Sequence, residues 1–308
     1  MDAKIAIGID IGGTNIKAGF VSADGSILYE TSRPTRAFEG RDALLAQLAS
    51  LAEELVALAV RTGSSVSGIG VGTAGYVTLD GAIAEATGNL PGWSGTRLKE
   101  ILERRLRLPV SIDNDANAMA VGEMWLGVGR GLEDAICVTL GTGIGGAIIR
   151  NRKHERGRDG YAGGFGHQTI VFGGHPCTCG LRGCWEQYAS VTALRRFARE
   201  SIGGEVSPEQ LFVLAQEGDA QALSVIDRYA QHVAAGLANL IHIFNPSAFI
   251  VGGAVTAQGA ALFGPIRHYM EKFALGAFVK REVLLLPAEL GSKAGMVGAA
   301  KLGLDASE

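Results

Sequence analysis

A chain of 308 residues is longer than a single hydrophobic core usually organises, so its length predicts two lobes. Hydrophobic residues make up 47% of the chain and its formal net charge is −3, which excludes a broad electrostatic attraction to nucleic acids or anionic membranes. The N-terminal residues form neither a basic segment nor a continuous hydrophobic stretch, and no uninterrupted apolar run approaches the ~20 residues of a membrane helix. We therefore expect a cytoplasmic protein that binds neither nucleic acid nor a membrane.

The predicted elements begin with an apolar strand, a turn rich in Gly and Thr and a second apolar strand over residues 5–21, and the same pattern returns over residues 135–150. These segments indicate a β-hairpin at the start of each of two related lobes. A leucine stripe with helical spacing predicts a helix over residues 43–62. Further strands are expected at residues 66–71, 110–112 and 248–251, and further helices at 96–106, 116–125 and 222–244. The alternation of strands and helices predicts an α/β fold.

The two glycine-rich turns are candidate phosphate-binding loops. Glycine lets the backbone approach a phosphate closely, where free N–H groups, a hydroxyl and an ammonium group can donate hydrogen bonds. A hairpin that needs positive φ angles explains one such turn equally well, but two similar turns favour phosphate binding; neither has the Gly-Lys-Ser/Thr ending of a P-loop. Asp10 is expected to hold Mg²⁺ through water. The candidate ligands in the two turns are Asp10, Gly12, Gly13, Thr14, Asn15, Lys17, Gly141, Thr142 and Gly143.

Three of the four cysteines, Cys177, Cys179 and Cys184, lie within eight residues of each other. In a chain without an export signal, this crowding favours a metal site over disulfide bonds. The Cys-x-Cys-x₄-Cys spacing with a nearby histidine fits a closed tetrahedral zinc site. The spacing leaves the fourth ligand open, because His175 lies two residues before the first of these cysteines and His167 ten residues before it.

A polar stretch formed by Asp113, Asn114 and Asp115 stands where a short strand is followed by a helix. Such strand ends open onto ligand sites in α/β sheets, so a carboxylate here is a candidate for chemistry. Asp and Asn also cap helix N-termini, and the spacing alone favours capping for Asp113 or Asn114. The residues by themselves leave both interpretations open.

The sequence resembles the ROK family of sugar kinases and related repressors, within the actin-like ATPase superfamily, from about residue 5 to about residue 303. The resemblance rests on the turn at residues 10–17, the Asn-Leu-Pro-Gly-Trp loop at 89–93, the Asn-Asp-x-Asn pattern at 114–117, and Gly-His followed by Cys-x-Cys-Gly-x-x-Gly-Cys-x-Glu at 166–186. It implies two ribonuclease-H-like lobes, an interlobe cleft for ATP and sugar, and a homo-oligomer, either a dimer or a tetramer. The small lobe is expected to comprise residues 1–118 and 295–308, and the large lobe, with the zinc module, residues 119–294.

By that resemblance, Asp115 is the general base, which accepts the proton of a sugar hydroxyl as its oxygen attacks the γ-phosphorus of ATP. His167 is implied as the fourth zinc ligand and also as a sugar contact. The other implied sugar-binding residues are Gly75, Asn89, Asn114 and Glu186, together with Asp115 itself. The residues implied to line the adenosine side are Gly252, Gly253 and Ala254. The implied cofactors are ATP, Mg²⁺ bound with ATP, and a structural Zn²⁺.

One position departs from the family pattern. Sugar-phosphorylating members usually carry Glu-x-Gly-His before the zinc loop, whereas this chain has Gly164-Phe165-Gly166-His167. Three readings follow: the space accepts a bulkier substituent such as an N-acetyl group, another residue or water replaces the missing acceptor, or activity is low or lost.

The resemblance therefore implies ATP-dependent phosphorylation of a hexose or an N-acetylhexosamine at the 6-hydroxyl. The alternative is a non-catalytic sugar-sensing or regulatory protein. Repressors of the family carry an N-terminal helix-turn-helix region, for which a phosphate turn that begins by residue 10 leaves no room.

Overall fold

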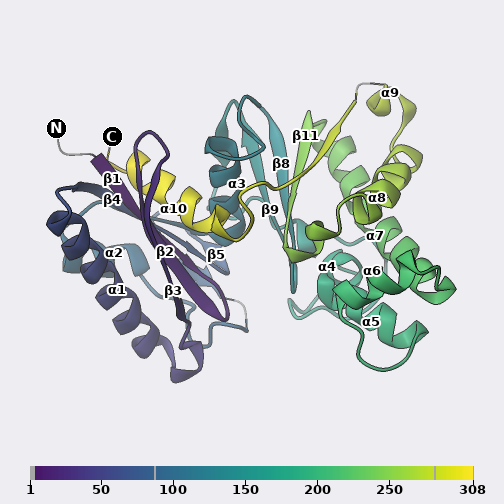
Figure 1. Cartoon of the computed structure of the whole chain (residues 1–308), viewed down its shortest axis with the longest axis horizontal. Helices are drawn as coiled ribbons and strands as arrows, with labels where there is room; N and C mark the ends of the chain where they lie inside the picture. Colours follow the sequence, from purple (N-terminus) through teal and green to yellow (C-terminus); the bar gives the residue numbers. More distant parts are fainter. Residues whose placement is uncertain (1–3, 87, 281, 308) are drawn as a thin grey trace. The chain divides into compact units, whose positions relative to one another are not determined.

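The computed structural model describes residues 4–86, 88–280 and 282–307, and its contacts divide the chain into two units (Figure 1). The first unit comprises the described residues up to Leu132, the segment Arg152–Ala162, and the described residues from Ser292 onward. The second unit comprises Glu133–Asn151 and Gly163–Gly291. The expected boundary after residue 118 falls inside helix α3 (Asp115–Trp125), which packs as a whole against α10 (Ala294–Asp305) in the first unit.

The first unit is built on a sheet with the strand order β3-β2-β1-β4-β7. Its strands are β1 (Lys4–Ile11), β2 (Asn15–Ser22), β3 (Ile27–Pro34), β4 (Ser65–Thr73) and β7 (Val110–Asn114). The first three form an antiparallel meander, whereas β4 runs parallel to β1 and β7 runs parallel to β4. The segment Ile5–Ile9 of β1 is apolar and buried because helices cover both faces of this central strand.

Helix α1 (Arg41–Arg61) covers one face of this sheet, where its leucines join the isoleucines of β1 in one hydrophobic core. Helix α10 covers the other face at very short range. A Cβ atom placed on Gly70 would overlap the carbonyl oxygen of Ala299, so the strand needs glycine where the helix crosses it. The remaining elements of this unit are η1 (Ala37–Glu39), β5 (Tyr76–Val77), β6 (Ile83–Glu85) and α2 (Leu98–Leu106), and η4 (Gly291–Lys293) leads into α10.

By length and composition alone, α1 is apolar enough to cross a membrane, which the sequence analysis did not anticipate. The structure gives the helix another role, because its buried leucines pack in the core of the first unit. Its opposite face carries Glu53 and Glu54, which pair with Arg105 and Arg33. A helix with one apolar stripe and one charged face is typical of the surface of a globular core.

The second unit is built on a sheet whose strands follow the order β9-β8-β11-β12. These strands are β8 (Ala135–Leu140), β9 (Ile144–Arg150), β11 (Ala248–Gly252) and β12 (Leu284–Pro287). The short strand β10 (Lys153–Glu155) belongs to the segment Arg152–Ala162 of the first unit. Strands β8 and β9 form an antiparallel hairpin, and β11 is parallel to both β8 and β12.

Helix α7 (Ala220–Phe244) is the long core helix of the second unit (Figure 1). It packs against α5 (Val191–Ser201), α6 (Pro208–Gln216) and α8 (Ala260–Phe273). The core between these helices and the sheet contains the fully buried aromatic side chains Trp185, Phe197, Phe212, Tyr229 and Phe249. The short elements of this unit are η2 (Phe165–His167), α4 (Glu186–Ala189), η3 (Ala254–Gln258) and α9 (Gly276–Val279).

The structure confirms the predicted α/β fold and its repeated hairpins. Each element expected from the sequence is present, with bounds that differ by no more than two residues from those predicted. The sequence reasoning did not single out β3, β12, α5, α6 or α8. Each sheet begins with an antiparallel hairpin that is followed by parallel strands, so the carboxyl ends of the parallel strands meet at one edge of each sheet.

Candidate active site

Three polar segments meet at the carboxyl edge of the first sheet. Asp10 on β1 lies in register with Gly72 on β4, and Gly72 in turn lies in register with Asp113 on β7. The chain leaves this edge through the Gly12–Asn15 turn after β1 and through α3 after β7. Residues that are far apart in sequence therefore come together because three parallel strands end side by side.

The carboxyl group of Asp10 occupies a restricted space at this edge. A Cβ atom on Gly295 would lie 2.5 Å from Asp10 Oδ2, so glycine at the start of α10 leaves room for the carboxylate. Burial and the negative charge of Asp115 raise the pKa of Asp10 to about 7, against the opposing effect of Lys17. A buried carboxylate whose ionisation is disfavoured by a second carboxylate fits a divalent cation, because Mg²⁺ prefers oxygen ligands and its charge relieves the repulsion.

The Gly12–Asn15 turn is held in place by hydrogen bonds to its backbone carbonyl oxygens. The Gly12 N–H donates to Asn15 O at 3.0 Å, which closes the turn between β1 and β2. Thr35 donates its hydroxyl to Gly12 O at 2.7 Å and its N–H to Thr14 O at 2.8 Å. The N–H groups of Gly13 and Thr14 take part in none of these bonds, so the turn presents them in a fixed loop, as phosphate binding requires.

Lys17 stands opposite Asp10 in the β1–β2 pair. Its ammonium group donates to Ser292 O at 2.9 Å. The expected phosphate contact from Lys17 would therefore have to replace or share this bond to the backbone.

The Asp-Asn-Asp stretch forms the junction between β7 and α3. Asn114 is the N-cap of α3: its Oδ1 accepts from the Ala116 N–H at 2.8 Å, and its Nδ2 donates to Gly75 O at 2.9 Å. The capping interpretation is thus correct for Asn114, whose side chain also hydrogen-bonds Asp115. Burial raises the pKa of Asp115, although hydrogen bonds from the backbone N–H groups of Ala116 and of Asp115 itself oppose that effect. An Asp115 carboxylate with a raised pKa is a stronger base than a fully solvated one.

Gly75 and Asn89 approach this edge from loops of the same unit. Gly75 has φ +108°, and a Cβ atom there would overlap Glu85 O, so the position requires glycine. Asn89 lies beside the phosphate turn, because a Cβ atom on Gly13 would sit 3.5 Å from Asn89 Cβ. The Asn89 loop is anchored by Trp93, whose fully buried indole donates from Nε1 to Thr73 Oγ1 at 3.1 Å.

The second unit places its two predicted nucleotide segments at one sheet edge as well. The Gly141–Gly143 turn follows β8 and Gly252 ends β11, and these strands are parallel neighbours. The turn is supported by the start of α5, where the Val191 N–H donates to Gly141 O at 2.8 Å and the Thr192 hydroxyl donates to Thr142 O at 2.7 Å.

Gly253 has φ +113°, and a Cβ atom there would overlap Leu140 O. Only glycine therefore allows the chain after β11 to pass this close to β8. Ala254, the next candidate, begins η3. The two candidate segments are adjacent because of this tight passage.

Four side chains in the loop before α4 form a cluster that fits zinc. One ligand atom each from His167, Cys177, Cys179 and Cys184 lies within 4.8 Å of all the others. The Sγ atoms of Cys179 and Cys184 are 3.6 Å apart, and Cys177 Sγ is 3.8 Å from His167 Nδ1. A tetrahedron with Zn–S bonds of about 2.3 Å has edges of about 3.8 Å, so the spacing matches.

His167 rather than His175 completes this cluster. The His175 ring packs against Tyr188, with ring centroids 5.2 Å apart, and its backbone N–H donates to the Tyr188 hydroxyl at 2.8 Å. His167 directs Nδ1 toward the cysteines, which leaves Nε2 for a second partner.

Glu186 connects the zinc cluster to the glycine turn of the second unit. Its Oε1 accepts from the Cys177 thiol at 3.1 Å and lies 4.0 Å from His167 Nδ1. Its other oxygen faces the turn, since a Cβ atom on Gly143 would lie 2.7 Å from Glu186 Oε2. The structure therefore brings together the two expected sugar ligands of this unit, His167 and Glu186.

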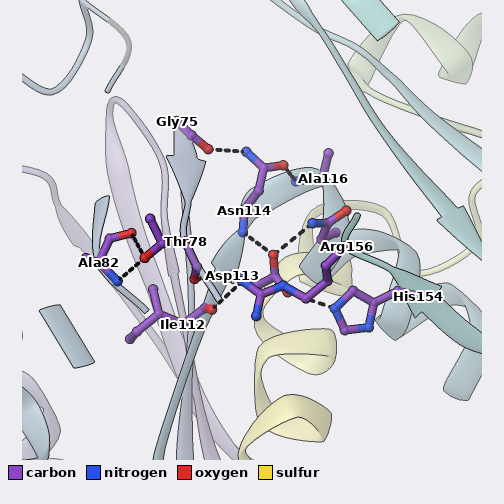
Figure 2. A network of polar contacts seen from close by, with 10 residues as sticks. Gly75, Thr78, Ala82, Ile112, Asp113, Asn114, Ala116, His154 and Arg156 are labelled. Carbon is purple, nitrogen blue, oxygen red and sulfur yellow. Dashed lines mark hydrogen bonds and ion pairs between the residues drawn. The ribbon is translucent and has the colours of Figure 1, made fainter. Parts of the chain in front are cut away.

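Three residues at the first sheet edge were missed by the sequence reasoning. Thr35 supports the phosphate turn, and both His154 and Arg156 contact Asp113 (Figure 2). His154 Nε2 lies 2.8 Å from Asp113 Oδ2. No local spacing could have revealed this pair, because 41 residues separate its members.

Comparison with known proteins places this geometry in context. Residues 6–306 match the model of the ROK family. The chain is 40% identical to a glucokinase of Streptomyces coelicolor, with 97% of each chain covered. It is also 31% identical to a xylose repressor of Caldicellulosiruptor bescii, with 88% of this chain and 71% of that protein covered. A solved ROK family glucokinase from Streptomyces griseus, in complex with glucose and AMPPNP, is 38% identical with a TM-score of 0.83, over 98% of this chain and 99% of that one.

Proposed function

This chain belongs to the ROK family, and we propose that it transfers the γ-phosphoryl group of ATP to the 6-hydroxyl of a hexose or an N-acetylhexosamine. Its similarity to glucokinases over nearly its whole length makes it an ATP-dependent sugar kinase. Glucose is the first candidate substrate, because the relatives near 40% identity are glucokinases and the similar solved structure holds glucose with an ATP analogue.

The observation that carries this proposal is the convergence at the first sheet edge. Asp10, the phosphate turn and Asp115 lie within one unit at the ends of the parallel strands β1 and β7, which flank β4. Phosphoryl transfer relies mainly on positioning and charge stabilisation, and this edge offers both, with a carboxylate for the metal and fixed N–H groups for phosphate. Mg²⁺, when bound with ATP, supplies positive charge that offsets the charge of the phosphates.

Asp115 is the proposed base. It stands at the first position of α3, where its Oδ1 already accepts from the Ala116 N–H at 2.9 Å, so the backbone orients the carboxylate. Its raised pKa, caused by burial, favours transfer of the proton from the sugar hydroxyl as that oxygen attacks the γ-phosphorus. After transfer the proton rests on Asp115, and ADP leaves with the electron pair of the broken P–O bond.

The proposed sugar ligands are Asn89, Asn114, His167 and Glu186. Zinc in the cluster has a structural role here, because four protein ligands leave it no open position for chemistry. It would fix His167, which could then use Nε2 to contact a sugar hydroxyl. Gly164 has φ −67°, outside the left-handed region that requires glycine, so its effect on the sugar site lies in the side chain it lacks.

A coupled ADP-release assay over glucose, N-acetylglucosamine, N-acetylmannosamine, mannose, fructose and allose tests the proposal. Asp115→Asn should lower kcat by about 10²–10⁴-fold on the accepted sugar, as expected for loss of a general base. Asp42→Asn, which changes an exposed carboxylate on α1, is the matched control and should keep native turnover. Near-native turnover by Asp115→Asn would show that another group is the base.

A native chain that binds sugars tightly and phosphorylates none of them would support the sensing alternative. The proposal also includes a cytoplasmic homodimer, by analogy with the family. Sedimentation equilibrium of the purified chain tests the dimer, and a single species at the monomer mass across micromolar concentrations would contradict it.

A further inference from the structure

Asp113 is a buried carboxylate with four polar contacts. Its side chain is only 2% exposed. Oδ1 accepts from the Asn114 N–H at 2.7 Å and from Asn117 Nδ2 at 2.8 Å, and Oδ2 accepts from His154 Nε2 at 2.8 Å and faces Arg156 Nε at 3.1 Å (Figure 2). Each oxygen therefore serves a different part of the chain: one holds the β7–α3 junction and the other holds the segment Arg152–Ala162.

The two basic side chains are what make this burial tolerable. Removing Asp113 from water acts to raise its pKa, but the hydrogen bond from His154 and the charge of Arg156 outweigh that effect, so the pKa lies below its ordinary value. A buried carboxylate with no partner would instead carry a large desolvation penalty. The Asp113 group is thus an ionised, fully partnered anchor.

Arg156 ties the anchor to the strands around it. Its Nη2 donates to Thr78 O at 3.2 Å and lies 3.5 Å from Ile112 O, while Nε faces Asp113 (Figure 2). One guanidinium therefore spans β7 and the loop that follows β5. The planar fork of arginine holds several acceptors in one fixed geometry, which lysine cannot do.

The Asp113 anchor is connected to Asp115, the proposed catalytic carboxylate, through Asn114. Asp113 Oδ1 accepts from the Asn114 N–H, the Asn114 amide group binds both Gly75 O and the Ala116 N–H, and Asp115 follows at once in the chain. A shift of the Asp113 side chain would therefore move the backbone that carries Asp115. Reacting groups tolerate little such movement, because a misplacement of about 1 Å can cost about 10²-fold in rate.

We propose that Asp113, His154 and Arg156 are positioning residues, which fix the β7–α3 junction so that Asp115 meets the sugar hydroxyl in the reactive geometry. This inference rests on the proposed function of Asp115. None of the three touches the reacting atoms in this role; they act through Asn114 and the first turn of α3.

A matched pair of substitutions at His154 tests the role. His154→Gln keeps an N–H donor near the place of Nε2, and His154→Phe keeps the planar ring but removes the donor. We expect His154→Phe to lower kcat by about 10- to 100-fold while the KM for ATP stays within about twofold, and His154→Gln to stay within about threefold of native turnover. Assays run well below each variant's Tm, on monodisperse protein, separate this effect from unfolding.

A second pair tests the charge. Asp113→Asn should lower kcat to a similar extent as His154→Phe. Arg156→Lys should also have a lower kcat than the native chain, because lysine lacks the planar fork of N–H donors. Equal kcat for His154→Phe and the native chain, with only the Tm reduced, would show that the network is merely structural and would overturn the proposal.

Amide hydrogen exchange supplies a readout that does not depend on activity. Asn114–Ala116 amides should exchange at least about tenfold faster in His154→Phe than in His154→Gln, since the junction loosens locally. If the native chain phosphorylates no sugar, the proposed function fails while this exchange result still decides whether the anchor fixes the junction. Unchanged exchange in both variants would overturn the positioning role on its own.

Discussion

Burial of Asp10 beside Asp115 lowers the folding stability of the chain at neutral pH, and this cost can be measured. Burial and the charge of Asp115 raise the pKa of Asp10 from 3.8 to about 7 in the folded chain. Because the folded-state pKa lies above the unfolded one, the stability that Asp10 provides is complete below about pH 3.8 and is lost as the pH rises through about 7. A shift of about 3 pKa units corresponds to about 4 kcal/mol, since each unit is worth about 1.36 kcal/mol.

Asp10→Asn should therefore stabilise the metal-free protein at high pH. Roughly 3 of the 4 kcal/mol would develop between pH 5 and pH 8.5, and because the carboxyl keeps some contact with water we expect about half of that amount. Urea denaturation of both proteins at the two pH values, in EDTA, measures the difference in the free energy of unfolding. The same substitution should remove Mg²⁺-dependent nucleotide binding, because an amide is a weaker metal ligand than a carboxylate.

Asp42→Asn provides the control, since its carboxyl is exposed on α1. This variant should show no pH-dependent gain. If the stability difference between Asp10→Asn and the native chain is the same at pH 5 and pH 8.5 within about 0.5 kcal/mol, Asp10 ionises normally and the repulsion argument fails. A gain at pH 5 that disappears at pH 8.5 would contradict the sign of the effect.

Three further predictions concern the turns, the zinc cluster and the sugar site. Thr35→Val leaves Gly12 O without its partner and should raise the KM for ATP about fivefold, equivalent to about 1 kcal/mol, whereas Thr35→Ser should not; equal KM values would refute the support role. Removing zinc by chelation should lower the Tm and raise the KM for the sugar while leaving the affinity for an ATP analogue unchanged, as calorimetry would show; an unchanged Tm at verified zero zinc would contradict a structural metal. Gly164→Glu should raise kcat/KM for glucose relative to N-acetylglucosamine at least about fivefold; no change in this ratio would show that position 164 does not face the substituent.

Features that depend on neighbours in the chain could be predicted from the sequence. The strand-turn-strand hairpins follow from apolar runs around glycines, and the structure places them within a residue of the prediction. The zinc cluster could be predicted because its three cysteines share one short loop, and spacing alone sets how such ligands can meet. The N-cap of α3 at Asn114 could also be predicted, because a capping hydrogen bond joins residues that are close in the sequence.

Features that depend on contacts between distant segments needed the tertiary structure. The choice of His167 over His175 came from the resemblance, and the geometry supports it because the His175 ring packs on Tyr188 instead. The first unit extends beyond residue 118, where the sequence analysis placed its boundary. The reason is that α3 packs on α10, which lies nearly 180 residues later in the chain.

By itself, the sequence determined the α/β order of this protein, its two glycine turns and the three cysteines of its zinc cluster. The resemblance to the ROK family added His167 and the carboxylate proposed as base. Only the tertiary structure decided what surrounds them: that Asp10 shares its edge with Asp115, that Thr35 supports the phosphate turn, and that Asp113 is anchored by His154 and Arg156. The physical reason is that a residue's chemistry is set by its type, whereas its ionisation and its position are set by whichever segments fold against it.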